Sequence, residues 1–312
     1  ELVSRKLRPL GRYFPELLDP LRAALAERCV VDGEIVVAGP DGNGLDFDAL
    51  LQRIHPAQSR IERLSVETPA AFVAFDLLAL GESSLLDVTM ADRRTGLVDA
   101  ISANESVHVT PATSDRAVAT DWFHRFEGAG LDGIVAKPLD GTYQPAKRAL
   151  AKVKHQRTAD CAVAGYRIHK DGNGVGSLLL GLFDDEGRMH SVGVASSFSA
   201  KRRAELLAEL EPRTHDALVG HPWREWAEHD SDSAGAATSG GSRWNAGKDL
   251  SFVPIRMGLV AEVSFGQLEG RRFRHGVGFL RWRPDRTPES CTYDQLDVAE
   301  AVSFTDFVTS PT

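Results

Sequence analysis

The sequence predicts an α+β protein of two domains, in which a domain of mixed antiparallel sheets and helices precedes a small β-barrel. The chain has 312 residues, about twice the length of a typical domain. Helical and strand-like segments alternate up to about residue 155, whereas short strands separated by turns dominate beyond it. We therefore expect a first domain over residues 1–156 and a second over residues 157–312.

Hydrophobic periodicity and β-branched residues predict the elements of the first domain. Leucines at helical spacing indicate a helix over 14–27, and a β-branched run indicates a strand over 30–37. The remaining elements are expected as a short helix near 47–54, a strand over 71–80, a helix over 116–128 and a strand over 133–137.

The second domain is expected to consist of short strands with one helix. Its strands are predicted over 161–168, 177–183, 190–194, 259–265 and 272–283, with a helix near 199–210. Asp-Gly and Glu-Gly turns separate the first three strands, and a loop rich in Ser, Gly, Ala and Asp occupies 230–242. Several short strands with a single helix are typical of an OB-fold barrel.

Composition excludes several classes of protein. Hydrophobic residues make up 42% and charged residues 26% of the chain, which is typical of folded globular proteins and not of disordered, collagen-like or disulfide-rich ones. No apolar run approaches the roughly 18–20 residues that a membrane span requires, so we expect no membrane association. Three widely spaced cysteines, Cys29, Cys161 and Cys291, favour a reducing cytoplasm over a disulfide framework or a structural zinc site.

The net charge of −8 gives no general argument for nucleic-acid binding, but two stretches are locally basic. Residues 143–157 carry five basic residues and no acidic one, and residues 271–286 carry six arginines and one aspartate. Such runs are either solvated faces or surfaces that contact phosphates. Their interleaving with apolar residues in strand-like patterns keeps the second interpretation open.

Three predicted strand segments contain polar or aromatic side chains that could bind a ligand. The two-residue period of a strand puts Lys152 and Lys154 on one face. This face either binds a polyanion or is an ordinary solvent-exposed strand face. Asp32 and Glu34 share a face in the same way and could bind a metal or a ribose, or form an exposed turn. Phe75, by itself, is expected to be a core residue.

Taken together and in chain order, these segments resemble the nucleotidyltransferase motifs of the ATP-dependent DNA ligases. Ser4-Arg5-Lys6 is similar to the short motif that follows the family's nucleophile. The other matches are Val31-Asp32-Gly33-Glu34, Phe75-Asp76-Leu77-Leu78, Asp132-Gly133-Ile134-Val135-Ala136-Lys137 and Lys152-Val153-Lys154.

The second half resembles the bacterial ligase C type. The matching stretches are residues 242–245, 247–252, 268–275 and 279–286. The resemblance therefore covers nearly the whole chain and implies an adenylation (nucleotidyltransferase) domain followed by an OB-fold domain.

The sequence also departs from the family's pattern. The Lys-x-Asp-Gly-x-Arg motif, whose lysine is adenylylated, is absent, because none of the eight lysines is followed by x-Asp-Gly. The motif belongs just before Ser4 and the chain has no initiator Met, so we expect an N-terminally truncated form of a longer ligase. Asp132 stands where most ligases have Glu, and Lys6 stands where Asn is frequent.

The resemblance implies a function and roles for individual residues. The protein is expected to seal nicks in duplex DNA with ATP and Mg²⁺ during DNA repair, in the bacterial cytoplasm at the nucleoid. Lys152 and Lys154 are the expected catalytic residues, and Glu34 and Asp132 would bind the metal as well as the nucleotide. The other expected nucleotide-binding residues are Arg5, Phe75, Lys137, Arg281, Arg283, Asp285 and Arg286, of which Phe75 would stack on adenine.

The expected DNA surface consists of basic residues that contact phosphates, because sealing a nick requires no sequence readout. These are Lys147, Arg148, Arg157, Arg271, Arg272 and Arg274.

Two alternatives remain open on the sequence. A chain without the nucleophilic lysine could be a non-catalytic module that binds nicks. An RNA ligase or a capping-type nucleotidyltransferase would use the same motifs in its first domain, although the ligase-C-like second half argues against both.

Overall fold

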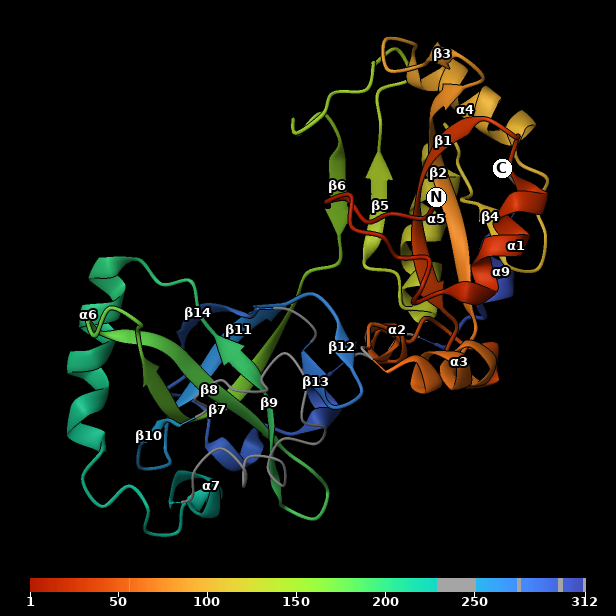
Figure 1. Ribbon diagram of the computed structural model, residues 1–312. Coiled ribbons are helices and arrows are strands. Elements are labelled where there is room, and N and C mark those ends of the chain that lie inside the picture. Colours follow the sequence, from red (N-terminus) through yellow and green to blue (C-terminus); the bar gives the residue numbers. More distant parts are fainter. Residues whose placement is uncertain (56, 229–250, 274–275, 297–299, 311–312) are drawn as a thin grey trace. The chain divides into compact units, whose positions relative to one another are not determined.

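The computed structural model describes residues 1–312 except residues 56, 229–250, 274–275, 297–299 and 311–312. The chain forms two compact units (Figure 1). Unit 1 consists of Glu1–Lys154 together with Val298–Thr312, and unit 2 consists of His155–Asp297. The first unit is therefore discontinuous in sequence.

The main sheet of unit 1 has β2 at its centre. Its strands are β1 (Cys29–Val37), β2 (Ala70–Leu80), β3 (Ser83–Ser84) and β4 (Val107–Val109). β2 pairs antiparallel with β1 and β3 and parallel with β4. The buried residues Phe72, Ala74 and Leu77 of β2 therefore lie in the core of the unit.

Helices α1 (Pro15–Ala24), α2 (Phe47–Arg53) and α4 (Met90–Ala100) add side chains to this core. Unit 1 also contains α3 (Gln58–Glu67), α5 (Arg116–Arg125) and the 3₁₀ turns η1 (Pro40–Gly42) and η2 (Phe126–Ala129), and α5 and η2 form a separate buried cluster around Trp122 and Phe126. Helix α1 begins with a proline at its first position, where the missing N–H costs no hydrogen bond. Its buried residues Leu17, Leu21 and Ala24 recur at helical spacing and pack against β2.

A second, two-stranded sheet in unit 1 carries two of the sequence motifs. It is formed by β5 (Gly133–Ala136) and β6 (Ala151–Lys154), which pair antiparallel. The loop between them docks on the start of α4, because Met90 N–H donates to the carbonyl of Gly141 and Ala91 N–H to that of Leu139.

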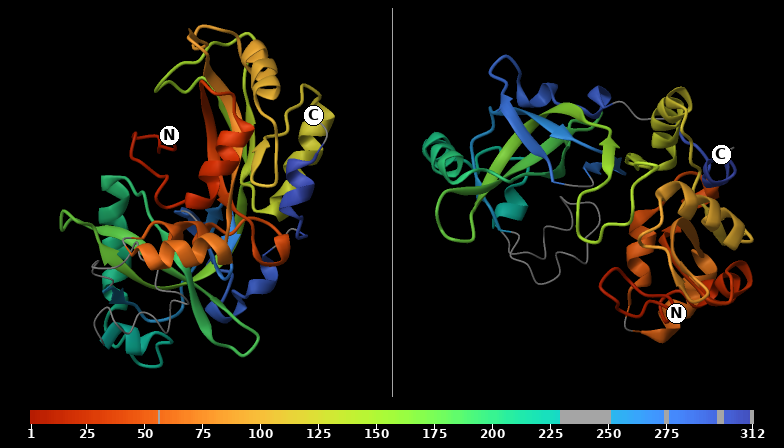
Figure 2. Two further views of the ribbon diagram at one scale, coloured as in Figure 1. Left: turned by 45° about the vertical axis from the view of Figure 1, so that its right-hand side comes forward. Right: turned by 90° about the horizontal axis from the view of Figure 1, so that it is seen from above.

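The C-terminal segment belongs to unit 1. Val302 exchanges backbone hydrogen bonds with Gly44 and Gly128, and the short helix α9 (Phe304–Val308) lies beside α5 (Figure 2). Phe307 packs edge-on against Phe126. A Cβ on Gly128 would lie 1.6 Å from the carbonyl oxygen of Glu300, so only glycine permits this approach. The expected second domain, 157–312, thus differs from unit 2 at its C-terminal end.

Unit 2 is an OB-type barrel. Its five main strands are ordered β14-β11-β7-β8-β9 and pair antiparallel. A bridge between Ala195 and Val277 joins the end of β9 to the residue before β14, which closes the barrel. The strands are β7 (Arg157–Ile168), β8 (Val175–Phe183), β9 (Met189–Ala195), β10 (Val253–Pro254), β11 (Val260–Phe265), β12 (Leu268–Glu269), β13 (Arg272–Phe273) and β14 (Gly278–Trp282).

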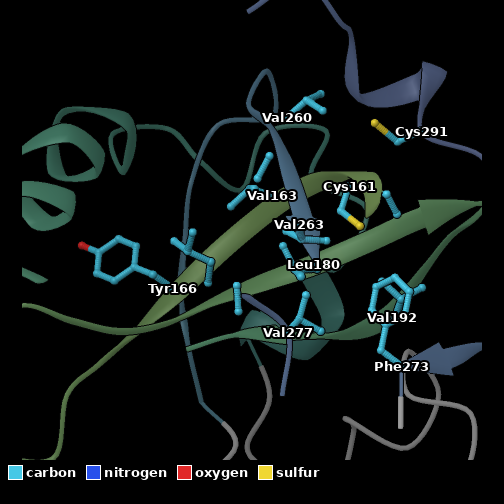
Figure 3. Packing of buried hydrophobic residues seen from close by; sticks show 14 of the residues in the cluster. Cys161, Val163, Tyr166, Leu180, Val192, Val260, Val263, Phe273, Val277 and Cys291 are labelled. Atoms are coloured by element: carbon cyan, nitrogen blue, oxygen red, sulfur yellow. The ribbon is translucent and has the colours of Figure 1, made fainter. Parts of the chain in front are cut away.

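Alternating side chains of these strands fill the barrel (Figure 3). Val163, Leu180 and Val263 come from three neighbouring strands and are fully buried. Helix α6 (Ala200–Leu210) adds Leu206 and Leu210 to the same core. The remaining helical elements of the unit are η3 (Glu211–Arg213), α7 (Arg224–Glu228), η5 (Pro288–Ser290) and η6 (Tyr293–Gln295).

The predicted α+β fold class is confirmed, and so is the order of most elements. Helices α3 and α4 were not predicted. The strand expected over 272–283 is instead the separate strands β13 and β14, and the loop expected over 230–242 lies outside the described residues. All three cysteines are free, and none of the described helices is both long and apolar enough to cross a membrane.

The first prediction concerns the C-terminal segment. Phe304 is buried beside Val36 and Val73, so Phe304→Ala should destabilise unit 1 by about 3–5 kcal/mol and leave unit 2 unchanged. Hydrogen exchange measured residue by residue should show faster exchange of the protected amides of unit 1, including those of β1 and β2, and unchanged exchange of the barrel amides. Phe265→Ala, which removes a buried ring from the barrel, is the matched control and should act on unit 2 alone. Faster exchange of the barrel amides in Phe304→Ala would contradict the assignment of this segment to unit 1.

Candidate nucleotide site

A β-bulge sets the orientation of Phe75. Asp32 of β1 pairs with Asp76 and Gly33 pairs with Ala74, so Phe75 has no partner on β1. An extra residue of this kind bends the strand and redirects a side chain. Phe75 is consequently half-exposed, whereas its neighbours Ala74 and Asp76 are buried. The expectation of a core role for Phe75 by itself is therefore not met.

Lys137 reaches from the end of β5 to Phe75. Its ammonium donates a 3.1 Å hydrogen bond to the carbonyl of Phe75 and lies 5.0 Å from the centroid of the Phe75 ring. It also lies 3.7 Å from the carboxylate of Asp76. Burial lowers the pKa of Lys137, and the negative charge of Asp76 opposes that shift. Two predicted nucleotide-binding residues thus meet at one place.

The β5–β6 pairing brings two further motifs together. Lys154 lies opposite Gly133 and Lys152 lies opposite Val135, so both lysines are on one face of this ribbon, and both are exposed. Lys154 forms an ion pair with Asp132. A Cβ on Gly133 would lie 1.9 Å from the carbonyl oxygen of Val153, which explains why glycine follows Asp132.

The Asp-Gly-Glu segment lies on β1 beside Asp76. The pKa of Asp32 is raised, chiefly by burial and further by Asp76, while Lys137 and Arg5 lower it. Arg5 is itself exposed, and Glu34 is an exposed residue opposite Val73. Of the four basic residues that unit 1 was expected to contribute to catalysis and nucleotide binding, Lys137 is thus largely buried, whereas Arg5, Lys152 and Lys154 are exposed.

A small cavity adjoins Lys137. Its volume is about 90 Å³, and it lies between the start of α4 and the loop that connects β5 to β6. Its lining comprises Met90, Arg93, Lys137, Pro138, Gly141, Thr142, Gln144, Ala149 and Leu150.

The described residues contain no group of three or more His, Cys, Asp or Glu side chains that could hold a metal ion. Mg²⁺ nevertheless binds through one or two carboxylates when phosphate oxygens and waters complete its coordination. Glu34 and Asp132 fit that requirement, because both carboxylates are accessible and the side chain of Asp132 is 44% exposed.

In unit 2, Arg283 and Arg286 converge on the buried carboxylate of Asp160. Arg283 donates to both oxygens of Asp160 at 3.0 and 2.9 Å, and Arg286 donates to one at 3.1 Å. Arg283 also forms an ion pair with Asp285 and lowers the pKa of that carboxyl to about 2. These groups therefore form one network with as many negative as positive charges.

The other arginines of unit 2 that were predicted as site residues do not belong to the network around Asp160. Arg281 pairs with Glu262, and Arg271 contacts His190 and lies 3.8 Å from Asp184. Arg157 begins β7 and Arg272 begins β13; both are half-buried. Arg274 lies outside the described residues. In unit 1, Lys147 and Arg148 are exposed in the loop before β6.

The sequence reasoning did not predict the counter-charges of two buried carboxylates. Asp76 pairs with Arg93 of α4, and Asp160 of β7 pairs with Arg283 and Arg286. The available signal was an acidic residue inside an apolar strand, since a buried carboxylate requires a counter-charge. The sequence pattern does not say which element supplies that charge.

Comparison with known proteins agrees with this arrangement. The model of the family described as "ATP dependent DNA ligase domain" matches residues 1–154, and that described as "ATP dependent DNA ligase C terminal region" matches residues 171–286. DNA ligase C of Mycobacterium tuberculosis is 53% identical over 99% of this chain and 87% of its own length. DNA ligase C2 of Mycolicibacterium smegmatis is 55% identical over 95% and 84%.

A solved structure agrees in fold. It comes from a study of Lig E DNA ligases, is 16% identical in sequence, and covers 91% of this chain and 86% of its own with a TM-score of 0.54. The chain therefore belongs to the ATP-dependent DNA ligases, and within them to the bacterial ligase C type.

Proposed function

We propose that this protein seals nicks in duplex DNA in three phosphoryl transfers: a lysine attacks ATP, AMP passes to the 5′-phosphate, and the 3′-hydroxyl displaces AMP. The contact of Lys137 with Phe75 is the observation that carries this proposal. An aromatic face beside a lysine ammonium suits a nucleotide, which has an aromatic base and anionic phosphates. The implied setting is DNA repair at the bacterial nucleoid.

The residues of unit 1 would supply the positioning and charge neutralisation that phosphoryl transfer requires. Phe75 would stack on adenine, and Lys152 and Lys154 would neutralise the phosphates at the reacting centre, with Arg5 and Lys137 as further phosphate contacts. When bound by Glu34 and Asp132, Mg²⁺ would neutralise phosphate charge.

The arginine network of unit 2 would act on the pyrophosphate. Arg281, Arg283, Asp285 and Arg286 match the motif that orients this leaving group during lysine adenylylation. Asp160 and Asp285 would hold the two half-buried guanidinium groups in fixed orientations, which reduces the entropy lost when an anion binds.

The DNA surface would consist of phosphate contacts from both units. Lys147 and Arg148 are the strongest candidates in unit 1, since both are exposed in a segment without acidic residues. Arg157, Arg271, Arg272 and Arg274 are the corresponding proposals for unit 2.

Phe75→Ala tests the nucleotide site. It should weaken ATP binding by about 1–3 kcal/mol, the usual contribution of a base–aromatic stack, and lower the melting temperature less than Phe72→Ala does, because Phe75 is only partly buried. Phe72→Ala, on the buried side of the same strand, is the control and should cost about 3–5 kcal/mol of stability. Unchanged ATP affinity in Phe75→Ala, measured by titration calorimetry, would remove the stacking role.

The salt dependence of DNA binding tests the DNA surface. Replacing Lys147 and Arg148 together with Ala should lower the slope of log K against log salt by about 1.8, since each lost phosphate contact removes about 0.9 on duplex DNA. Replacing Lys201 and Arg224, which are exposed on helices of unit 2, is the matched control and should leave the slope unchanged. Equal slopes for the wild type and the first variant would place Lys147 and Arg148 outside the interface.

A pre-adenylylated nick tests the chemistry of the 312-residue chain. We expect no protein label from α-labelled ATP, because the chain contains no Lys-x-Asp-Gly-x-Arg motif, yet slow sealing of the pre-adenylylated nick with Mg²⁺. Lys152→Ala and Lys154→Ala should abolish sealing, and Lys201→Ala should not.

Melting curves must accompany this assay, so that loss of sealing is not confused with loss of folding. Labelled protein would show that another lysine is the nucleophile. Sealing of nicked RNA in preference to nicked DNA would favour an RNA ligase, and binding without sealing would favour a nick-binding module.

A further inference from the structure

The carboxylate of Asp76 is buried and held by a forked contact from Arg93. The side chains of Asp76 and Arg93 are 6% and 3% exposed. Nε of Arg93 donates to Oδ1 at 2.8 Å, and Nη2 donates to Oδ2 at 3.2 Å. Two parallel bonds fix the orientation of the carboxylate as well as its charge, which a point donor such as lysine cannot do.

The rest of the Arg93 guanidinium contacts α4, the turn before it and the ring of Tyr143, whose centroid lies 5.9 Å away. Nη1 donates to the carbonyl of Val88 at 2.6 Å, and Nη2 lies 3.4 Å from the sulfur of Met90. Arg93 is thus fully engaged by the protein and makes no contact with Phe75 or Lys137 in the described structure.

Lys137 depends on the same carboxylate. Its ammonium lies 3.7 Å from Oδ2 of Asp76, the oxygen that also accepts from Nη2 of Arg93. Oδ2 of Asp76 therefore contacts two cations, of which Lys137, with 16% of its side chain exposed, is the one nearer to solvent. The charge of Asp32 also acts on Lys137. A partly exposed ammonium beside the ring of Phe75 can bind an anion.

We propose that Arg93 is a positioning residue of the nucleotide site: it orients the carboxylate of Asp76, which in turn holds the ammonium of Lys137 where a nucleotide phosphate binds. This inference rests on the proposed function. It assigns Arg93 an effect on phosphate recognition that is separate from its contribution to stability.

The discriminating measurement compares two ligands in Arg93→Lys. This variant keeps the positive charge but loses the paired hydrogen bonds to the two oxygens of Asp76. The affinity for ATP should therefore fall about tenfold, which corresponds to the loss of one charged hydrogen bond, while the affinity for adenosine should stay unchanged. Arg94→Lys is the matched control, because Arg94 is the next residue of α4 and bonds only the carbonyl of Thr110 among the contacts described for it. We expect both affinities to be unchanged in the control.

A double-mutant cycle shows whether Arg93 acts through Lys137. Lys137→Met should weaken ATP binding but not adenosine binding. In that background Arg93→Lys should have no further effect on the ratio of the two affinities, since the residue it positions is gone. Additive losses in the cycle, or an equal loss for ATP and adenosine in Arg93→Lys, would overturn the proposal in favour of a structural role.

The pH profile gives a second readout. Deprotonation of Lys137 removes its attraction for phosphate, so ATP affinity should fall as pH rises through the lowered pKa of this lysine. Asp76 and Asp32 raise that pKa, whereas Arg93 and Arg94 lower it. In Arg93→Lys a misoriented Asp76 supports the ammonium less, and the fall should begin at lower pH. An unshifted profile would contradict the proposal.

Two further outcomes separate this inference from the proposed function. If Arg93→Lys does not fold, the pair Asp76→Asn with Arg93→Gln removes both buried charges together and should give the same selective loss of ATP affinity. If Lys137→Met binds ATP normally while the wild-type chain still seals the pre-adenylylated nick, the role of Arg93 is refuted and the proposed function stands. A wild-type chain that neither binds ATP nor seals would refute both.

Discussion

The organisation of unit 1 depends on how β2 distributes its side chains at Phe75 and Asp76. The bulge opposite β1 leaves the ring partly exposed and the carboxylate buried. A buried carboxylate is tolerated only with counter-charges and hydrogen bonds, and here the counter-charges come from α4 and from the residue that follows β5. The requirement for charge compensation therefore connects the sheet, a helix and the two-stranded ribbon beside the aromatic ring.

Unit 2 shows the same arrangement around Asp160. A buried acid on a central barrel strand collects two arginines from the segment after β14, and Gln295 binds the backbone of Asp160 on both its N–H and its carbonyl. In both units a buried acid orients cations that are more exposed than the acid itself: Asp76 orients Lys137, and Asp160 orients Arg283 and Arg286. The long, flexible lysine and arginine side chains are thus held in defined positions before a ligand binds.

The sequence was sufficient to predict the helices and strands that have a clear hydrophobic periodicity. It was not sufficient to predict contacts between elements that are distant in the sequence. The β-branched and apolar runs of β1 and β2 and the alternation in the barrel strands predicted the sheets. The bulge at Phe75 was not predictable, because it arises from the register with β1. Arg93 was missed because any element packed against β2 could have supplied the counter-charge. The C-terminal segment was assigned by its place in the sequence, whereas its partners, Gly44 and Gly128, lie more than 170 residues earlier.

The return of the chain to unit 1 has a consequence for the order of folding during synthesis. All residues of the barrel leave the ribosome before residues 300–310 do, so the barrel can complete its core while the first unit still lacks the segment that covers Val36, Val73 and Phe126. Domains usually fold in the order in which they are made. In this protein the unit whose synthesis begins first is completed last, because its closing contacts join residues far apart in the sequence, such as Gly44 and Val302.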